Sequence, residues 1–131
     1  MTVPDDVRRS AIQAAVDALA AGDSDGAHAI YHDDAVLEFP QSGERFEGLS
    51  NFKEWRERYP ADVRFAVRRI SGSGAVWVRE LTVTYDGGPP MLGIAVLEFS
   101  GERVALERIY VCETWDAPAW RAPWRSETTA V

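Results

Sequence analysis

Several residue types are scarce in this sequence, and each shortage argues against a class of protein. Cys112 is the only cysteine, so no internal disulfide can form, and a reducing compartment is expected. Lys53 is the only lysine, and 21 acidic residues outnumber 14 basic ones, giving a formal net charge of −7. Nucleic-acid-binding proteins usually show a basic face, so we expect no nucleic-acid partner. Because no apolar run approaches a membrane span and the N-terminus lacks signal-peptide order, we expect a soluble cytoplasmic protein without a membrane partner.

The composition is that of one folded domain. The chain has 131 residues, of which 46% are hydrophobic and 27% charged, and this supports a core but not two domains. We therefore treat residues 1–131 as a single domain with a Trp- and Pro-rich tail over 115–131. The rings of Trp115, Trp120 and Trp124 are expected to cover a sheet edge or a partner surface, because large aromatic side chains mostly bury area.

Helical patterns occupy the first half of the chain. Apolar residues at helical spacing predict a helix over 5–21, stopped by Gly22. A second short helix is predicted from residue 24 to residue 31. Ser50 can cap a third helix, which Pro60 ends.

Strand patterns dominate the second half, where the hydrophobic period changes to two. Turn signals rich in glycine and proline separate the strands. Helices followed by an antiparallel meander indicate an α+β fold, with three N-terminal helices packed on a curved antiparallel sheet of strands of mixed length. The predicted strands cover residues 35–39, 45–48, 63–70, 75–85, 91–99 and 103–114.

The run ALAAGDSDGAHAIYHDDAVLEFPQSGERFEGLSNFKEW, residues 18–55, resembles the SnoaL-like family of the nuclear transport factor 2 (NTF2-like) superfamily. The ERIYV segment and the APAWRAPW tail are similar to the same group. The resemblance implies an NTF2-like, or cystatin-like, cone. That fold hosts isomerases, dehydratases, epoxide hydrolases, polyketide cyclases and non-catalytic binders, so the function depends on the site.

The resemblance places apolar residues of this chain at the positions of the catalytic side chains of ketosteroid isomerase. The base and the two oxyanion donors of ketosteroid isomerase fall on Phe39, Ala15 and Ala95, none of which can transfer a proton or donate a hydrogen bond. Steroid-type isomerisation is therefore not expected.

Two further chemistries occur on the same fold. The acids of limonene-epoxide hydrolase fall on Thr82 and Ile109, and its arginine falls on or beside Arg79 and Glu80, where a one-residue slip would swap faces. The histidine pair of scytalone dehydratase lies on the sheet, whereas the two histidines of this chain lie in or just after its second helix.

Two glutamates are the candidate catalytic residues. If Gly87 and Gly88 form a two-residue hairpin, Glu80 lies opposite Ala95. If the next turn has three residues, Ala95 lies opposite Glu107. The two carboxylates would then be about 10 Å apart at the backbone, in an apolar hollow that raises the pKa of at least one of them. In the alternative interpretation they are surface ion-pair partners, and a two-residue second turn would flip the last strand.

The resemblance also suggests which residues line a pocket. In this fold the third helix faces the pocket, so some of its aromatic residues are expected to touch a ligand, and tyrosine hydroxyls could orient it. The predicted ligand-binding residues are Leu19, Tyr31, Phe39, Trp55, Tyr59, Thr82, Ala95, Leu97 and Ile109.

Other clusters are assigned structural roles. His28 and His32 have the spacing of a metal pair but no third ligand in register, so a solvated helix face, no metal and no cofactor are predicted. An apolar outer sheet face predicts a homodimer, as in many relatives. The residues assigned to that face are Trp77, Leu81, Val83 and Tyr85.

The sequence leaves two classes of function open, and with them whether the chain is an enzyme. One is a cofactor-free enzyme of the polyketide cyclase, isomerase or hydrolase kind, which uses Glu80 and Glu107 on a small hydrophobic or aromatic molecule. The other is a non-catalytic small-ligand-binding protein, or a dimeric accessory protein with a filled cone.

Overall fold

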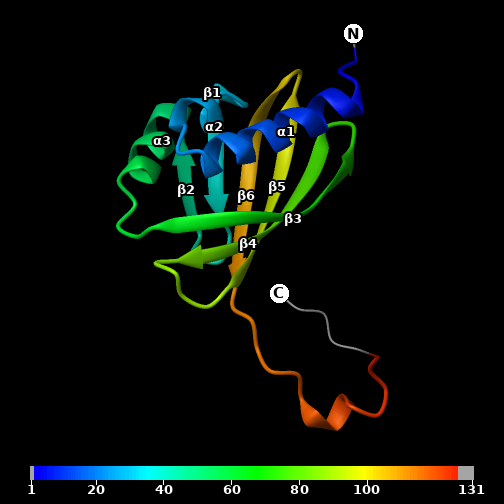
Figure 1. Cartoon of the computed structure of the whole chain (residues 1–131). Coiled ribbons are helices and arrows are strands. Elements are labelled where there is room, and N and C mark those ends of the chain that lie inside the picture. The colour runs from blue at the N-terminus through cyan, green and yellow to red at the C-terminus, as the bar shows by residue number, and fades with distance from the viewer. Residues whose placement is uncertain (1, 127–131) are drawn as a thin grey trace.

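One curved sheet with three helices on one face forms the body of the chain in the computed structural model, which describes residues 2–126 (Figure 1). The strand order is β2-β1-β6-β5-β4-β3, and the β1–β6 pair is the one parallel pair among these residues. This confirms the predicted α+β class. The elements are α1 (Asp5–Ala20), α2 (Ser24–His28), β1 (Tyr31–Phe39), β2 (Glu44–Glu47), α3 (Leu49–Glu57), β3 (Val63–Ser73), β4 (Val76–Tyr85), β5 (Met91–Ser100), β6 (Arg103–Cys112) and a short 3₁₀ turn (Ala119–Arg121).

The second helix is shorter than the sequence pattern predicts. The Asp23 carboxylate caps α2 by accepting a hydrogen bond from the Gly26 amide at 3.0 Å. The helix ends at His28, and Tyr31 already begins β1. The predicted strand over 35–39 therefore starts four residues earlier, and Tyr31 enters the cone from a strand.

The core lies between α1, α3 and the inner sheet face. Phe52 of α3 and Leu37, Leu97 and Val104 of the sheet are fully buried there. The indole of Trp77 is also buried and donates to the Gly74 carbonyl at 2.9 Å, which satisfies its one polar atom.

Arg8, near the start of α1, is buried although it is charged. Its Nη1 donates to the Gly74 carbonyl at 2.7 Å, and its Nη2 donates to the Gly101 carbonyl at 2.8 Å. These carbonyls belong to the turns β3–β4 and β5–β6. One guanidinium thus ties the first turns of α1 to two hairpins at the same end of the sheet.

The β4–β5 register differs by one residue from the predicted one. The tight turn uses Asp86 and Gly87, both at positive φ, and the Gly88 amide donates to the Tyr85 carbonyl at 2.9 Å. Pro89 and Pro90 then interrupt the ladder, because proline has no amide proton to donate. Pairing resumes at Met91. A one-residue shift moves every side chain of a strand to the opposite face.

The predicted row of two glutamates is wrong for this reason. Arg79, not Glu80, lies opposite Ala95, and Glu80 lies opposite Ile94 on the outer face. Glu107 lies opposite Leu97 instead of Ala95.

Glu107 nevertheless faces the core, because a bulge compensates for a short turn. Ser100 pairs with Arg103, which leaves a two-residue turn where three residues were predicted. An extra residue, Ala105, lies between the pairs Phe99–Val104 and Glu98–Leu106 and restores the inward direction of Glu107.

The predicted composition of the outer sheet face is also wrong. The residues assigned to it from the sequence, Trp77, Leu81, Val83 and Tyr85, are on the inner side, where the first three are buried and Leu81, Val83 and Tyr85 border a cavity. The alternation of β4, β5 and β6 puts half-buried apolar side chains on the outer side instead. These are Val78, Leu92, Ile94, Val96, Leu106 and Tyr110.

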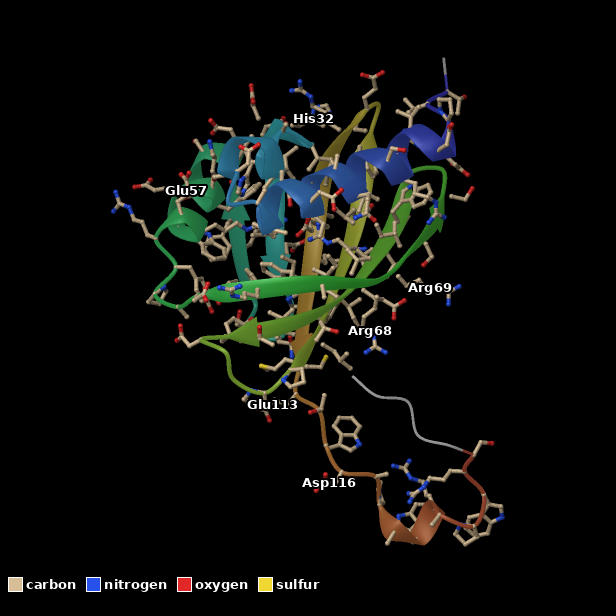
Figure 2. All side chains as sticks on the ribbon, viewed as in Figure 1. His32, Glu57, Arg68, Arg69, Glu113 and Asp116 are labelled. Atoms are coloured by element: carbon tan, nitrogen blue, oxygen red, sulfur yellow. The ribbon has the colours of Figure 1, made fainter. Side chains whose placement is uncertain are left out.

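After β6 the chain leaves the body as an extended segment, residues 113–126, which we call the arm (Figures 1 and 2). Its three tryptophans are among the most exposed large side chains: Trp115 is 81% exposed, Trp120 72% and Trp124 79%. The sheet edge of this chain is therefore not what they cover.

No helix within residues 2–126 is long and apolar enough to cross a membrane. The single-domain assignment of residues 1–131 and the cytoplasmic location stay predictions.

Candidate functional site

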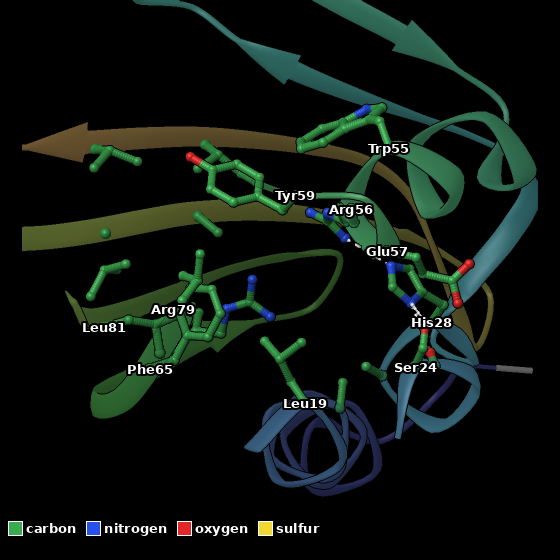
Figure 3. A pocket seen from close by; sticks show the side chains of 18 of the residues that line it. Leu19, Ser24, His28, Trp55, Arg56, Glu57, Tyr59, Phe65, Arg79 and Leu81 are labelled. Atoms are coloured by element: carbon green, nitrogen blue, oxygen red, sulfur yellow. Dashed lines mark hydrogen bonds between the residues drawn. The ribbon is translucent and has the colours of Figure 1, made fainter. Parts of the chain in front are cut away.

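A cavity of about 420 Å³ opens between the inner sheet face, α1 and the C-terminal half of α3 (Figure 3). Its walls are mainly apolar. Trp55 of α3 and Tyr59, just after the end of α3, border it on one side, and Leu19 of α1 borders it on another. The sheet contributes Phe65, Leu81, Val83, Ile109 and Val111.

A buried polar cluster lies at one wall of this cavity. Glu107 is fully buried, and its Oε1 accepts a hydrogen bond from the Tyr31 hydroxyl at 2.7 Å. Its Oε2 lies 3.4 Å from Nη2 of Arg56 and 3.5 Å from Nη2 of Arg79. Tyr31, Arg56 and Arg79 line the cavity, whereas Glu107 lies behind them. The carboxylate thus holds the two guanidinium groups at the wall.

The cluster carries an excess of positive charge and free donors. Two guanidinium groups face one carboxylate. Within residues 2–126, Nε of Arg79 and Nε1 of Trp55 are buried without a hydrogen-bond partner, although both residues border the cavity. A buried donor without an acceptor costs free energy. An acceptor oxygen in the cavity would relieve that cost.

Burial raises the pKa of the Tyr31 hydroxyl, and the charge of Glu107 raises it further. The phenol therefore stays protonated at neutral pH, as its donation to Glu107 requires. Tyr31 acts as a donor in the cluster and is not a base.

His28, at the end of α2, also lines the cavity. Its Nδ1 lies 2.7 Å from the Ser24 carbonyl, which can only accept, so Nδ1 carries the proton. Its Nε2 lies 3.3 Å from Nη1 of Arg56 and accepts from it (Figure 3). Burial lowers the pKa of His28, and the positive charges of Arg56 and Lys53 lower it further. The imidazole is thus a neutral acceptor at pH 7.

His28 should make the stability of the fold depend on pH. Its pKa is lower in the folded chain than the ordinary value of 6.5, so the unfolded chain binds more protons between these two values. The free energy of unfolding is expected to rise with pH through that window and to fall as the pH drops below about 6.5. Urea titrations from pH 7.5 to 5.5 measure this slope.

The control is His28→Gln, which removes the titrating ring. Its slope between these pH values should be smaller than that of the wild type. Equal slopes in the two proteins would contradict a depressed His28 pKa, since His28 then would not contribute to the linkage.

Seven of the predicted ligand-binding residues border the cavity, and two do not. Thr82 shares the outer face of β4 with Glu80, as a consequence of the β4–β5 register. Leu97 is fully buried in the core cluster. A role in ligand binding stays a prediction for the seven others, which are Leu19, Tyr31, Phe39, Trp55, Tyr59, Ala95 and Ile109.

The three apolar replacements at the isomerase positions all border the cavity. Ala15, Phe39 and Ala95 therefore leave it without a proton acceptor at those places. The β4–β5 register also shows which of Arg79 and Glu80, the two candidate positions for the arginine of the epoxide hydrolase pattern, faces the cavity. Arg79 points inward and meets Glu107 of the last strand.

Sequence reasoning missed Arg56, Arg79 and His28. Arg56 follows Phe52 by four residues and shares its helical face, a spacing that could have revealed it. Arg79 was missed because the predicted β4–β5 register placed it on the outer face of the sheet. His28 was assigned to a solvated helix face, but it is buried, and His32 lies beyond the end of α2 in β1.

Metal-ligating side chains do not gather at this site. Within residues 2–126, no group of three or more His, Cys, Asp or Glu side chains could hold a metal ion. The predicted absence of metal and cofactor stays a prediction.

Comparisons with known proteins agree with this architecture. A family model described as a SnoaL-like domain matches residues 12–107. No curated protein matches the chain. An NTF2-like protein of unknown function from Burkholderia xenovorans LB400 has a solved structure that is 37% identical, with a TM-score of 0.91 over 96% of this chain and 98% of that chain.

Two further solved structures are more distant. A putative ketosteroid isomerase from Kribbella flavida is 22% identical, with a TM-score of 0.86 over 99% of this chain and 95% of that chain. An LEH-like epoxide hydrolase from M. tuberculosis is 25% identical, with a TM-score of 0.68 over 80% of this chain and 82% of that chain.

Proposed function

The chain belongs to the SnoaL-like family of the NTF2-like superfamily, and on that premise we propose that it binds a small, largely apolar molecule through an acceptor oxygen. The ring or chain of the molecule fills the cavity, and its oxygen lies against Arg79 and Arg56. The observation that carries the proposal is the buried cluster of two guanidinium groups on one carboxylate, with Nε of Arg79 unpartnered.

The size and chemistry of the cavity support such a ligand. About 420 Å³ falls in the range of roughly 300–1,000 Å³ that is usual for small-molecule sites. Such sites combine apolar walls with a few polar groups that fix orientation. Here the walls come from aromatic and aliphatic side chains, and the polar groups come from one cluster. An aromatic carboxylate, phenolate or enolate has matching chemistry.

The two arginines should favour an anion over a neutral oxygen. Guanidinium groups pair with carboxylates in a bidentate manner, and hydrogen bonds to charged groups are stronger than neutral ones. Glu107 neutralises one of the two positive charges, so the other is available to the ligand. The sequence-based role of Glu107 as a proton-transfer group is less well supported, because its carboxylate is fully buried and engaged by three side chains.

A catalytic version of the same site is the second candidate, and neutral His28 favours it. If the ligand is a carbonyl compound, His28 Nε2 takes a proton from the carbon next to the carbonyl. The C–H electron pair then forms the enolate, whose oxygen Arg56 and Arg79 stabilise. Arg56 must leave His28 Nε2 for the ligand oxygen in this step. Cofactor-free isomerases, cyclases and hydrolases use related proton transfers, and turnover separates this candidate from binding alone.

A matched pair of probe ligands tests the anion preference. We expect 2-naphthoate to bind more tightly than 2-naphthalenemethanol in isothermal titration calorimetry. Arg79→Met should weaken 2-naphthoate binding by about 10- to 100-fold, the effect of losing a charge-assisted hydrogen bond, and should change binding of the alcohol by less than about threefold. Arg69→Met is the matched control, because it removes an exposed arginine of β3 that does not border the cavity.

Two outcomes would contradict the proposal. If Arg79→Met weakens both ligands equally, the arginine only maintains the shape of the cavity. If Arg69→Met weakens 2-naphthoate as much as Arg79→Met does, the preference comes from overall charge and the cavity is not the site.

The proposal also includes a homodimer through the outer sheet face. The half-buried side chains Val78, Ile94, Val96 and Leu106 give this face an apolar centre. The Glu98–Arg108 ion pair lies on the same face, where Glu98 is opposite Leu106 and Arg108 is opposite Val96. Apolar side chains together with paired charges are a composition that protein interfaces share.

A further inference from the structure

The arm, residues 113–126, makes no hydrogen bond to the body within the part of the chain that the structure describes. Its hydrogen bonds join arm residues to one another, as between Nη1 of Arg125 and the Pro118 carbonyl at 3.4 Å. We propose that two copies of this chain exchange arms, so that the tryptophans of each arm pack on the outer sheet face of the other copy. The inference rests on the homodimer proposed above through the outer sheet face and adds the arms to that interface, and it does not involve the cavity.

The exposed indoles are the first argument. A buried tryptophan removes about 150–250 Å² from water, so three of them offer roughly 450–750 Å² per arm. Two exchanged arms then offer about 900–1,500 Å², which approaches the 1,200–2,000 Å² usual for a stable protein interface. Monomeric proteins rarely expose so much aromatic surface in one segment.

Charge supports a second copy as the occupant of this interface. Residues 118–126 hold Arg121 and Arg125 and no acidic residue. Residues 1–117 hold 20 acidic and 12 basic side chains, a formal charge of −8. The arm as a whole has no net charge, because Glu113 and Asp116 balance Arg121 and Arg125. Its distal part, residues 118–126, is basic and is therefore attracted to the acidic remainder of another copy, and such attraction favours the encounter of partners.

The geometry allows the exchange. The arm follows β6, which lies between β1 and β5 in the middle of the sheet, so it starts at the end of a central strand. Fourteen residues reach at most about 46–50 Å when extended. The six strands of a sheet span roughly 24 Å. The arm can therefore cross the outer face of a second copy that is stacked on the first.

The same segment exists in relatives. Residues 1–112 make up about 85% of this chain. The Burkholderia and Kribbella structures cover 96% and 99% of it, so both alignments must include most of the arm. The epoxide hydrolase structure covers 80%, less than the body alone. The arm thus distinguishes a subset of the fold, as expected of a segment with its own role.

Sedimentation of the full chain tests the exchange. The wild type should be a dimer at micromolar concentration. The triple variant Trp115→Ser/Trp120→Ser/Trp124→Ser should dissociate at least about tenfold more readily, because it loses the apolar area of both arms. The matched triple variant with phenylalanine at the three positions should stay dimeric. Circular dichroism should show an unchanged body in all three, since the arm makes no hydrogen bond to the body of its own copy.

Cross-linking shows where the arm lies. A chain with Trp120→p-benzoylphenylalanine is mixed as ¹⁵N-labelled and unlabelled copies, refolded together and irradiated. Cross-linked peptides that join a labelled arm to an unlabelled β4, β5 or β6 support the exchange. Cross-links confined to one copy, cross-links to other surfaces, a monomeric wild type or a serine variant that dimerises normally would each overturn it.

Discussion

Glu107→Gln lowers the free energy of unfolding by about 3–5 kcal/mol, the expected cost of removing one partner from a buried ion pair. The glutamine can still accept from Tyr31, but it no longer compensates the charges of Arg56 and Arg79. Two uncompensated guanidinium groups then face each other in a cone with few other polar groups. Since small domains are stable by only about 5–15 kcal/mol, the loss should be evident in a urea or thermal unfolding curve.

Two comparisons make this result specific to the cluster. Glu38→Gln removes the partner of Arg45 from a pair at 3.5 Å whose side chains are 51% and 30% exposed, and it should cost about 0–1 kcal/mol. The triple variant Arg56→Met/Arg79→Met/Glu107→Leu removes all three charges together and should recover most of the stability. A cost below about 1 kcal/mol for Glu107→Gln would show that the carboxylate does not hold the arginines.

Gly72→Ala should be the most damaging of the small substitutions. Gly72 lies in β3 at φ +153°, and a Cβ there would lie 2.6 Å from the Val76 carbonyl oxygen and 2.8 Å from the Trp77 Cα. Both are backbone atoms of the neighbouring strand, which cannot turn aside as a side chain can. Backbone strain and overpacking each cost about 1–3 kcal/mol, so we expect a loss of roughly 2–5 kcal/mol in urea unfolding.

Gly74→Ala is the matched control in the same hairpin. Gly74 has φ +65°, and nothing lies within 4 Å of its Cβ position, so only the conformational cost of about 1 kcal/mol remains. Equal losses in the two variants would mean that β3 and β4 separate easily at Gly72, and that the buried Trp77 does not depend on their close contact.

The fold followed from the sequence because its signals are local and repeated. The apolar spacing of α1, the proline after α3 and the period-two strands each require only a few neighbouring residues. The resemblance to the SnoaL-like family rested on the run over residues 18–55 and is confirmed by the family match.

Only part of the candidate site could be predicted from the sequence, because its residues depend on how β4, β5 and β6 are aligned with one another. The sequence DGGPP can turn at Gly87–Gly88 or at Asp86–Gly87, and these choices differ by one residue. That difference exchanges Glu80 for Arg79 at the cavity wall. The bulge at Ala105 has no local signal, because it compensates for a turn that has to be known first.

The contact of Arg8 with two hairpins has a consequence for the motion of the cone. The first turns of α1 are fixed to the sheet at Gly74 and Gly101, while its last turns, with Ala15 and Leu19, border the cavity. We therefore expect movement of α1 relative to the sheet to be smallest at Arg8 and largest at its last turns, so that any widening of the cavity occurs at its α1 rim.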